Sequence, residues 1–289
     1  SEFKYKYIIM CGIGGFYSIF SKFTENLENL NKAMLMMEHR GPDANSIWTS
    51  DDLKIGFCHT RLSIIDLNVS SNQPMRSHDN KYILVFNGEI YNYLDLKKKL
   101  ISKGCKFRTN SDSEVVIEAY RIWKQNLFEH LEGMFTFAIY DNVNKQIFIA
   151  NDHIGKKPLY YYESEEGFFF ASELPALKKI ISKPLNYNYE AIASIFIRNL
   201  RNIPPPYTPY KEIKKLRSGT YLIIKNKKIT QEALYYKLKG PNITGDFFNF
   251  ESLINEQVSK RLISDAPLGI LLSGGLDSTI ISSLMAKNK

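Results

Sequence analysis

The chain has 289 residues, of which 44% are hydrophobic and 24% are charged. This length accommodates about two domains, and the composition excludes a disordered tail, a collagen-like chain and a disulfide-rich miniprotein. The net charge of +8 is spread over short, separate lysine runs. We interpret it as a solvated surface, and we expect no nucleic-acid partner.

The cysteine pattern argues against disulfides and metal. Three cysteines, at positions 11, 58 and 105, form no CxxC pair, so we expect neither a disulfide framework nor a metal site. A reducing cytoplasm is then the simplest location. No apolar run approaches the roughly 18 residues of a transmembrane helix, so we expect no membrane partner. Glycines interrupt the apolar stretch at 8–17, which argues against a secretory signal.

Short strands separated by hairpin loops dominate the first part of the chain. Alternation and turn signals predict strands at 13–20, 55–59, 82–86, 135–140, 146–150, 167–171, 220–224 and 228–231. Helical periodicity predicts helices at 24–38, 93–103, 112–126 and 188–198. Many strands with few helices favour an α+β fold, in which helices cover antiparallel sheets.

The pattern changes after a connection at 239–249 that contains Gly, Pro and Asn, which we interpret as a linker. A helix is predicted from 250 to 263. The apolar run at 269–272 is typical of a buried parallel strand, and a helix follows at 279–286. This is the first β-α unit of an α/β domain. Because one unit cannot bury both of its faces, we expect this domain to be truncated at Lys289.

The loop between that strand and that helix has the sequence SGGLDS at 273–278. Its glycines let the backbone approach an anion, while the serine hydroxyls and the helix N-terminus supply hydrogen-bond donors. The loop lacks the GK[ST] of a Walker A motif. We therefore predict a phosphate-binding loop of a different class.

Cys11 is ambiguous on its own, because a lone cysteine is usually a buried and inert thiol. If Met10 were removed, however, Cys11 would become the first residue. Its α-amine, with a pKa of about 8, could then accept the thiol proton. We interpret residues 1–10 as a leader or a vector-derived extension; with Met10 in peptide linkage, Cys11 has no free amine.

A series of motifs follows Cys11 in a fixed order. They are HRGPD at 39–43, RLSIID at 61–66, NGEIYN at 87–92, SDSE at 111–114, GKKPLYY at 155–161 and ASEL at 171–174. With the CGI at Cys11, this series resembles the N-terminal-nucleophile glutaminase domain of glutamine-hydrolysing asparagine synthetases. The loop at 273–278 is similar to the pyrophosphate loop of the family's synthetase domain.

The resemblance implies a four-layer αββα sandwich of two antiparallel sheets at 11–238. The linker at 239–249 would join it to the start of an α/β ATP-pyrophosphatase domain at 250–289. Cys11 would attack the side-chain amide of glutamine and release ammonia, leaving a glutamyl thioester. Asn87 and Gly88 would form the oxyanion hole. Arg40 and Asp43 would brace the loop that carries the nucleophile.

The resemblance also implies how the substrates are bound. Arg61 would hold the α-carboxylate of glutamine, and Asp112 would hold its α-ammonium with help from Glu89. The implied glutamine site is Arg61, Leu62, Ile64, Ile65, Asn87, Gly88, Glu89 and Asp112. The implied ATP site is Leu272, Ser273, Gly274, Gly275, Asp277 and Ser278.

These roles imply an ATP-dependent ligase of asparagine biosynthesis. Ammonia from glutamine would pass to the second domain, which would amidate aspartate with ATP and Mg²⁺. The substrates would be glutamine, aspartate and ATP, and the assembly could be a homodimer. Two alternatives remain open. The same architecture could amidate a sugar acid or close a lactam ring, or the first domain could bind glutamine without catalysis.

Overall fold

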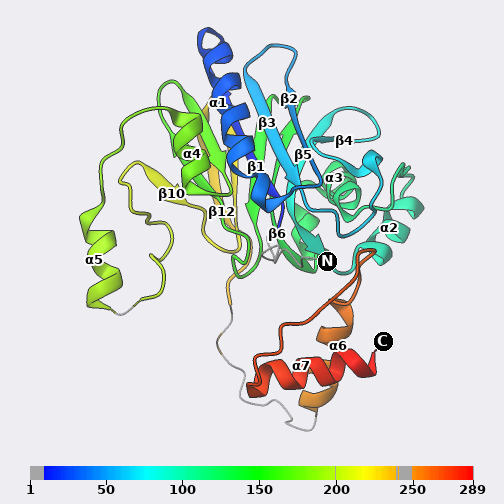
Figure 1. Ribbon diagram of the computed structural model, residues 1–289. Coiled ribbons are helices and arrows are strands. Elements are labelled where there is room, and N and C mark those ends of the chain that lie inside the picture. The colour runs from blue at the N-terminus through cyan, green and yellow to red at the C-terminus, as the bar shows by residue number, and fades with distance from the viewer. Residues whose placement is uncertain (1–9, 199, 239, 241–248, 289) are drawn as a thin grey trace, which may run out of the picture.

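Two antiparallel six-stranded sheets lie at the centre of the structure (Figure 1). The structure is a computed structural model, and it describes residues 10–198, 200–238, 240 and 249–288. The first sheet has the strand order β10 (Ile213–Lys215), β8 (Tyr160–Glu163), β9 (Gly167–Ala171), β1 (Gly12–Ser18), β3 (Ile55–Arg61) and β2 (Ala44–Thr49). The second has the order β12 (Lys228–Leu234), β11 (Thr220–Lys225), β7 (Gln146–Asn151), β6 (Gly133–Asp141), β5 (Tyr82–Ile90) and β4 (Met75–Arg76).

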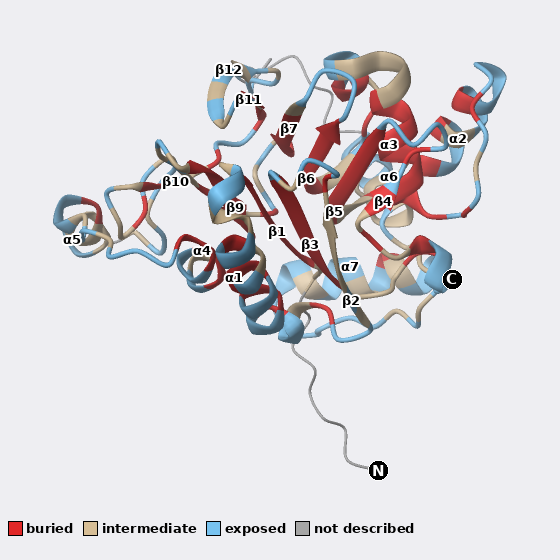
Figure 2. Ribbon diagram, turned by 90° about the horizontal axis from the view of Figure 1, so that it is seen from above, coloured by how far each residue is buried: buried red, intermediate tan, exposed pale blue. Residues whose placement is uncertain are grey.

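The sheets stack face to face, and helices cover their outer faces. The side chains of Phe57 and Phe170 from one sheet meet Val85 from the other in a shared core. A second core lies between the first sheet and α1 (Phe23–Met36) with α4 (Leu174–Ile181). A third lies between the second sheet and α2 (Tyr93–Ser102) with α3 (Asp112–Trp123). This arrangement confirms the predicted four-layer αββα sandwich, whose strands are largely buried (Figure 2).

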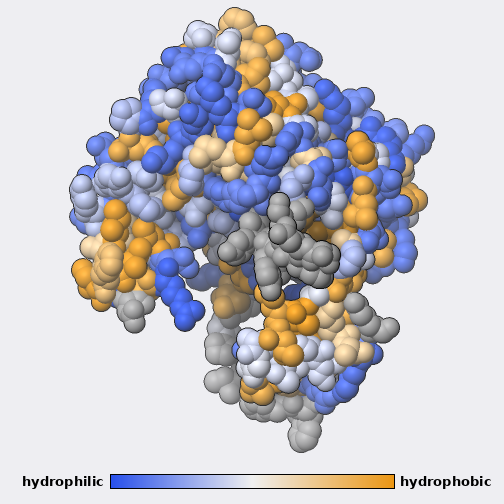
Figure 3. Space-filling view, in the orientation of Figure 1, coloured by the Kyte–Doolittle hydropathy of each residue, from blue (hydrophilic) through white to orange (hydrophobic). Residues whose placement is uncertain are grey.

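Three further helices of the described residues, α5 (Tyr189–Ile197), α6 (Phe250–Lys260) and α7 (Leu276–Lys287), lie outside these layers. The described chain also forms four 3₁₀ helices, η1 (Phe20–Lys22), η2 (Glu38–Arg40), η3 (Val69–Ser71) and η4 (Lys124–Glu129). Leu127 and Phe128 of η4 are buried in the core beside the second sheet. Figure 3 shows apolar residues gathered over α5, where Phe196 and Ile197 are exposed. Among the residues that the structure describes, no helix has the length and apolar character needed to cross a membrane.

Most of the predicted elements form within a few residues of the expected bounds. The predicted strand at 13–20 ends at Ser18, because the chain turns into η1. The short strands β2, β4, β8 and β10 and the helix α4 were not predicted. The predicted linker at 239–249 falls mainly outside the described residues.

The strand predicted at 269–272 does not form. In the described chain no neighbouring strand pairs with this segment, and Leu271 and Leu272 are 78% and 61% exposed. A single strand leaves its backbone groups without ladder partners, so the apolar run alone is not sufficient. The helix that follows does form, as α7, and packs against α6.

Gly15 tests how tightly the neighbouring strands β3 and β9 restrain β1. A Cβ atom at this position would lie 2.7 Å from the Gly56 carbonyl oxygen and 2.8 Å from the ring of Phe170. We expect Gly15→Ala to lower the free energy of unfolding by about 1–3 kcal/mol, because backbone and rings would have to shift. The measurement is the urea midpoint at unchanged m-value. Gly269→Ala is the control, since a Cβ there meets nothing within 4 Å. Equal midpoints for both variants would contradict the expectation.

Candidate active site

Cys11 lies immediately before β1 and contacts the loop that follows β3. The Leu62 N–H donates a hydrogen bond to the Cys11 Sγ at 3.3 Å, and the same sulfur lies 3.6 Å from the Leu62 carbonyl oxygen. Burial raises the pKa of the Cys11 thiol, and the Leu62 amide opposes that rise. Because the thiolate is the reactive form, this thiol needs a base before it can act as a nucleophile.

Three side chains fix the backbone around the nucleophile. The Thr60 hydroxyl accepts a hydrogen bond from the Gly12 N–H at 3.1 Å. The Arg40 Nε donates to the Cys11 carbonyl oxygen at 3.2 Å, and its Nη1 lies 2.8 Å from a Glu173 carboxylate oxygen. The Arg40–Glu173 ion pair therefore fixes the backbone of Cys11, directly before β1 begins.

Asp43 supports the facing loop. Its carboxylate accepts a hydrogen bond from the Ser63 N–H at 2.8 Å, and its backbone N–H donates to the Arg61 carbonyl oxygen at 3.0 Å. Ser63 follows Leu62, whose amide contacts the Cys11 sulfur. Arg40 and Asp43 therefore support the backbone around Cys11 and do not line the pocket itself.

Asn87 and Gly88 lie within β5, although Asn-Gly by itself is typical of a hairpin turn. The Asn87 side chain is fully buried, and neither its nitrogen nor its oxygen has a partner in the described chain. Gly88 lets β5 pack closely against β6, since a Cβ there would lie 2.3 Å from the Met134 carbonyl oxygen. A buried amide without a partner is costly unless a ligand supplies one.

His59 links the two sheets beside this amide. Its Nε2–H donates to the Phe86 carbonyl oxygen at 3.1 Å, from β3 to β5. Burial lowers the pKa of His59 to about 3, so the ring is neutral at physiological pH. His59 therefore acts in packing and not as a base.

Asp112 is a buried carboxyl group at the N-terminus of α3. Its Oδ2 accepts a hydrogen bond from the Ile90 N–H at 3.0 Å. Burial raises the pKa of Asp112 to about 7, and the Glu89 charge adds to the rise. Burial also raises the pKa of Glu89 and lowers that of Lys157 to about 8, while their mutual attraction opposes both changes. The pocket therefore holds acidic groups that a cationic ligand would stabilise.

Arg61 ends β3 with its guanidinium among acceptors of the next loop. Nη1 donates to the Asn68 carbonyl oxygen at 2.8 Å and to the Asn72 Oδ1 at 2.7 Å. Nη2 donates to the carbonyl oxygens of Ile65, at 3.5 Å, and of Asp66. The buried cation thus folds residues 62–72 back over the pocket.

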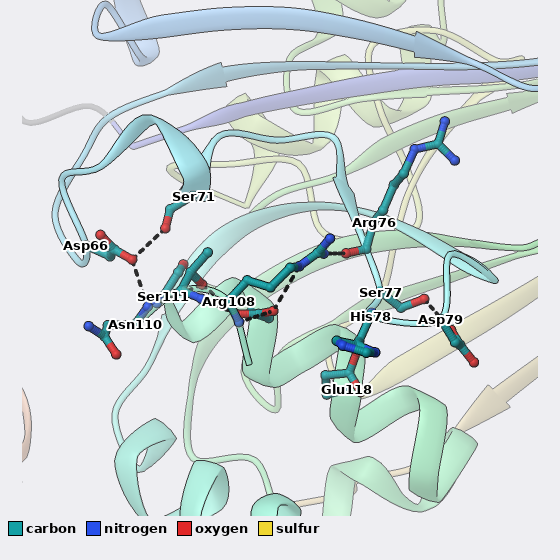
Figure 4. A network of polar contacts seen from close by, with 12 residues as sticks. Asp66, Ser71, Arg76, Ser77, His78, Asp79, Arg108, Asn110, Ser111 and Glu118 are labelled. Atoms are coloured by element: carbon teal, nitrogen blue, oxygen red, sulfur yellow. Dashed lines mark hydrogen bonds and ion pairs between the residues drawn. The ribbon is translucent and has the colours of Figure 1, made fainter. Parts of the chain in front are cut away.

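Asp66 ties the same loop to the start of α3 (Figure 4). Its carboxylate accepts hydrogen bonds from the Ser71 hydroxyl at 2.7 Å and from the Asn110 N–H at 2.8 Å. Hydrogen bonds from the Ser71 and Asn68 side chains and the Asn110 amide outweigh burial and lower the pKa of Asp66 to about 2. Because Asn110 lies two residues before Asp112, this contact fixes the loop relative to the buried carboxyl group.

One pocket contains all nine residues predicted for glutamine binding and catalysis. Its lining is Met10, Cys11, Arg61, Leu62, Ile64, Ile65, Gln73, Phe86, Asn87, Gly88, Glu89, Ser111, Asp112 and Ser113. The free volume is about 30 Å³, enough for about one water molecule and too little for glutamine. Since Met10 is part of the lining, it takes up space beside the nucleophile.

Sequence reasoning missed several residues that shape this pocket. Gln73 accepts a hydrogen bond from the Phe86 N–H at 2.6 Å and donates to the Ser113 hydroxyl at 3.0 Å. Ser172 accepts a hydrogen bond from the Ile13 N–H at 3.0 Å. These partners lie 13 to 159 residues apart, so no local pattern could reveal them.

The loop at 273–278 lies away from this pocket, at the N-terminus of α7. The hydroxyls of Ser273 and Ser278 lie 3.0 Å apart, and Gly274 has a φ of +80°, which favours glycine. The loop is exposed. The described residues contain no group of three or more His, Cys, Asp or Glu side chains that could hold a metal ion.

Comparison with known proteins gives a consistent result. Asparagine synthetase [glutamine-hydrolyzing] 1 of Bacillus subtilis is 34% identical over 95% of this chain and 44% of its own length. Amidase chry2 of Gibberella zeae is 30% identical over 96% of this chain and 43% of its own length. The chain thus spans less than half the length of these relatives.

Solved structures support the fold. Glutamine phosphoribosylpyrophosphate amidotransferase of B. subtilis superposes with a TM-score of 0.56 at 17% identity, covering 96% of this chain and 64% of the other.

The family model described as a glutamine amidotransferase domain matches residues 10–236, and the asparagine synthase model matches residues 249–289. The chain therefore belongs to the glutamine amidotransferase family, with a short asparagine synthase segment after the amidotransferase domain.

Proposed function

We propose that the sandwich hydrolyses glutamine to glutamate and ammonia, as the glutaminase half of an asparagine synthetase. One observation carries this proposal: the Cys11 thiol shares a pocket with the buried, unpartnered amide of Asn87. A buried amide nitrogen that has no partner in the described chain is available to donate to an oxyanion.

The reaction follows from this geometry. The Cys11 thiolate adds to the side-chain carbonyl carbon of glutamine, and the electron pair of the C=O bond moves to oxygen. The Asn87 side-chain NH₂ and the Gly88 N–H donate to that oxyanion. The base that took the thiol proton gives it to the amide nitrogen. When the carbonyl re-forms, this nitrogen leaves as ammonia and a thioester remains. Water then attacks the thioester, releasing glutamate and returning the proton to the sulfur.

The charged groups of the pocket suit the other end of glutamine. The α-ammonium would contact Asp112 with Glu89 nearby, and its charge would lower the raised pKa values of both carboxyl groups. Arg61 would bind the α-carboxylate, using donor capacity beyond its contacts with the loop. A free catalytic thiol is suited to a reducing cytoplasm.

The second half of the proposal concerns the segment from 249 onward. The exposed serine hydroxyls, the left-handed Gly274 and the α7 N-terminus are donors that fit the phosphates of ATP. ATP with Mg²⁺ would activate the acceptor carboxylate by adenylation, and ammonia would then displace AMP. Aspartate is the acceptor that we propose.

The relationship to an amidase favours one alternative, a different acceptor for the same ammonia. The test uses a protein that contains this chain together with a complete synthetase domain. Aspartate is compared with sugar acids and lactam precursors as acceptors. Pyrophosphate release that depends on one of the other acids, and not on aspartate, would replace asparagine synthesis with that reaction.

The link between Met10 and Cys11 is the first testable feature. In a chain that begins at Cys11, the α-amine supplies a base, and the pocket gains the volume that Met10 occupies. General-base catalysis is typically worth about 10²–10⁴-fold. We expect ammonia release from glutamine to be faster by at least that factor in the Cys11-first chain than in the 1–289 chain.

A glutamine-analogue diazoketone should label only the Cys11-first chain, at Cys11. Cys11→Ala in that chain is the control and should release no ammonia. Equal rates for the two chains, with Met10 confirmed as attached by mass, would contradict the proposed base. Glutamine binding by calorimetry without any ammonia release would instead identify a non-catalytic binding domain.

Asp112 should show a conflict between stability and binding. Its raised pKa means that the ionised form destabilises the fold at pH 8, and this penalty fades as the pH falls from about 7 toward the unfolded-state pKa of about 4. Asp112→Asn keeps an acceptor for the Ile90 N–H and removes the charge. We expect its gain in Tm to be larger at pH 8 than at pH 5, while the KM for glutamine rises about tenfold or more. A Tm difference that does not change with pH would show that Asp112 is not a buried charge.

Asn87 should contribute to the transition state more than to substrate binding. Loss of one oxyanion donor typically lowers kcat by about 10²–10³. We expect Asn87→Ala to show such a loss with little change in KM or in stability, because the side chain has no protein partner in the described chain. Asn87→Asp also lacks the amide donor and should show a similar loss of kcat, but its buried carboxyl group should lower the stability as well. A normal kcat in both variants would remove Asn87 from the oxyanion hole.

A further inference from the structure

We propose that Asp265, which the second segment contributes, is a positioning residue for the glutamine pocket. Its carboxylate Oδ2 accepts a hydrogen bond from the Asp66 N–H at 2.7 Å. Its own N–H donates to the Ile64 carbonyl oxygen at 2.9 Å. Two hydrogen bonds thus join Asp265 to the loop after β3. Asp66 and Asp265 are 199 positions apart in the sequence. The inference rests on the proposed glutaminase function.

The loop to which Asp265 is hydrogen-bonded covers the pocket. Ile64 and Ile65 line the pocket, and Leu62, two residues earlier, contacts the Cys11 sulfur. Asp66 adopts a φ of +51°, a left-handed conformation that non-glycine residues rarely adopt without support. Asp265 supplies that support from outside the sandwich. Without it, the Asp66 N–H and the Ile64 carbonyl would lose these partners.

The segment around Asp265 is itself anchored to the sandwich. Ile263 packs against the core beside the second sheet. The Arg261 guanidinium lies over the ring of Tyr91, 4.7 Å from its centroid, and the Lys260 ammonium lies 2.9 Å from a Glu132 carboxylate oxygen. Three different interactions therefore hold the strap formed by residues 260–266 against the end of β5 and the start of β6.

The position of this strap gives it a second consequence. Asp265 lies eight residues before Ser273, so the chain runs directly from the pocket loop to the proposed phosphate loop. If the Asp265 contact stabilises the arrangement of residues 62–68 that binds the ligand, then a bound ligand must stabilise the Asp265 contact to the same extent, by thermodynamic linkage. Occupation of the pocket should therefore be detectable at Asp265.

The experiment measures hydrogen exchange in the 1–289 chain and in three variants. Asp265→Ala removes the acceptor, and we expect faster exchange in residues 62–68 with unchanged exchange in β6 and β7. Asp265→Asn keeps an acceptor oxygen and should restore most of the protection. Glu251→Ala, at an exposed carboxylate on α6, is the matched control and should behave like the parent chain.

Kinetics separate positioning from general folding. In whichever form of the chain hydrolyses glutamine, Asp265→Ala should raise the KM on the order of tenfold and change kcat less, because the loss of one charged hydrogen bond acts on pocket closure. Diazoketone labelling of Cys11 in the Cys11-first chain should slow exchange at the Asp265 amide. Unchanged exchange at 62–68 and unchanged KM in Asp265→Ala would overturn the proposal.

The outcomes distinguish this inference from the proposed function. If no form of the chain hydrolyses glutamine, yet Asp265→Ala loosens residues 62–68, the contact stands and the glutaminase proposal fails. If glutamine is hydrolysed with an unchanged KM and exchange profile in Asp265→Ala, the function stands and the positioning role fails.

Discussion

The geometry of the pocket depends on the packing between two sheets. Cys11 precedes β1 in the first sheet, whereas Asn87 and Gly88 belong to β5 in the second. Their distance is therefore set by the core between the sheets, which aromatic and branched side chains fill at close packing. The His59–Phe86 hydrogen bond crosses this interface one residue before Asn87 and restrains the alignment of the sheets.

A buried cation organises the remaining wall. The cost of burying the Arg61 guanidinium is offset only when its N–H groups are satisfied, and the acceptors come from residues 65–72. That requirement folds the loop into one conformation, which Asp66 then fixes to α3. Arg61, which we propose binds the substrate carboxylate, thus also holds the wall of the site in place.

Apolar runs predicted most of the strands, and the family resemblance predicted the layers and the pocket residues, but neither predicted the contacts that hold the pocket in place. The runs at 135–140 and 146–150 are apolar at most positions because each strand has one face toward each core. Gln73 and Asp265 gave no signal, since their roles depend on partners distant in the sequence. The apolar run at 269–272 misled the prediction, because a strand requires a neighbour as well as a hydrophobic sequence.

Buried polar groups in the pocket lower the stability of the fold and at the same time define its ligand. The Asn87 amide lacks a partner within the described chain, and burial disfavours the charged form of Asp112. A molecule that combines an oxyanion-forming amide with a charged amine, as glutamine does, would give the Asn87 amide a partner and would stabilise the Asp112 carboxylate. The large aromatic cores on both sides of the second sheet can tolerate that cost, because burial of their rings outweighs a few unsatisfied groups. The groups that would recognise this ligand are therefore the same groups whose burial costs the fold stability.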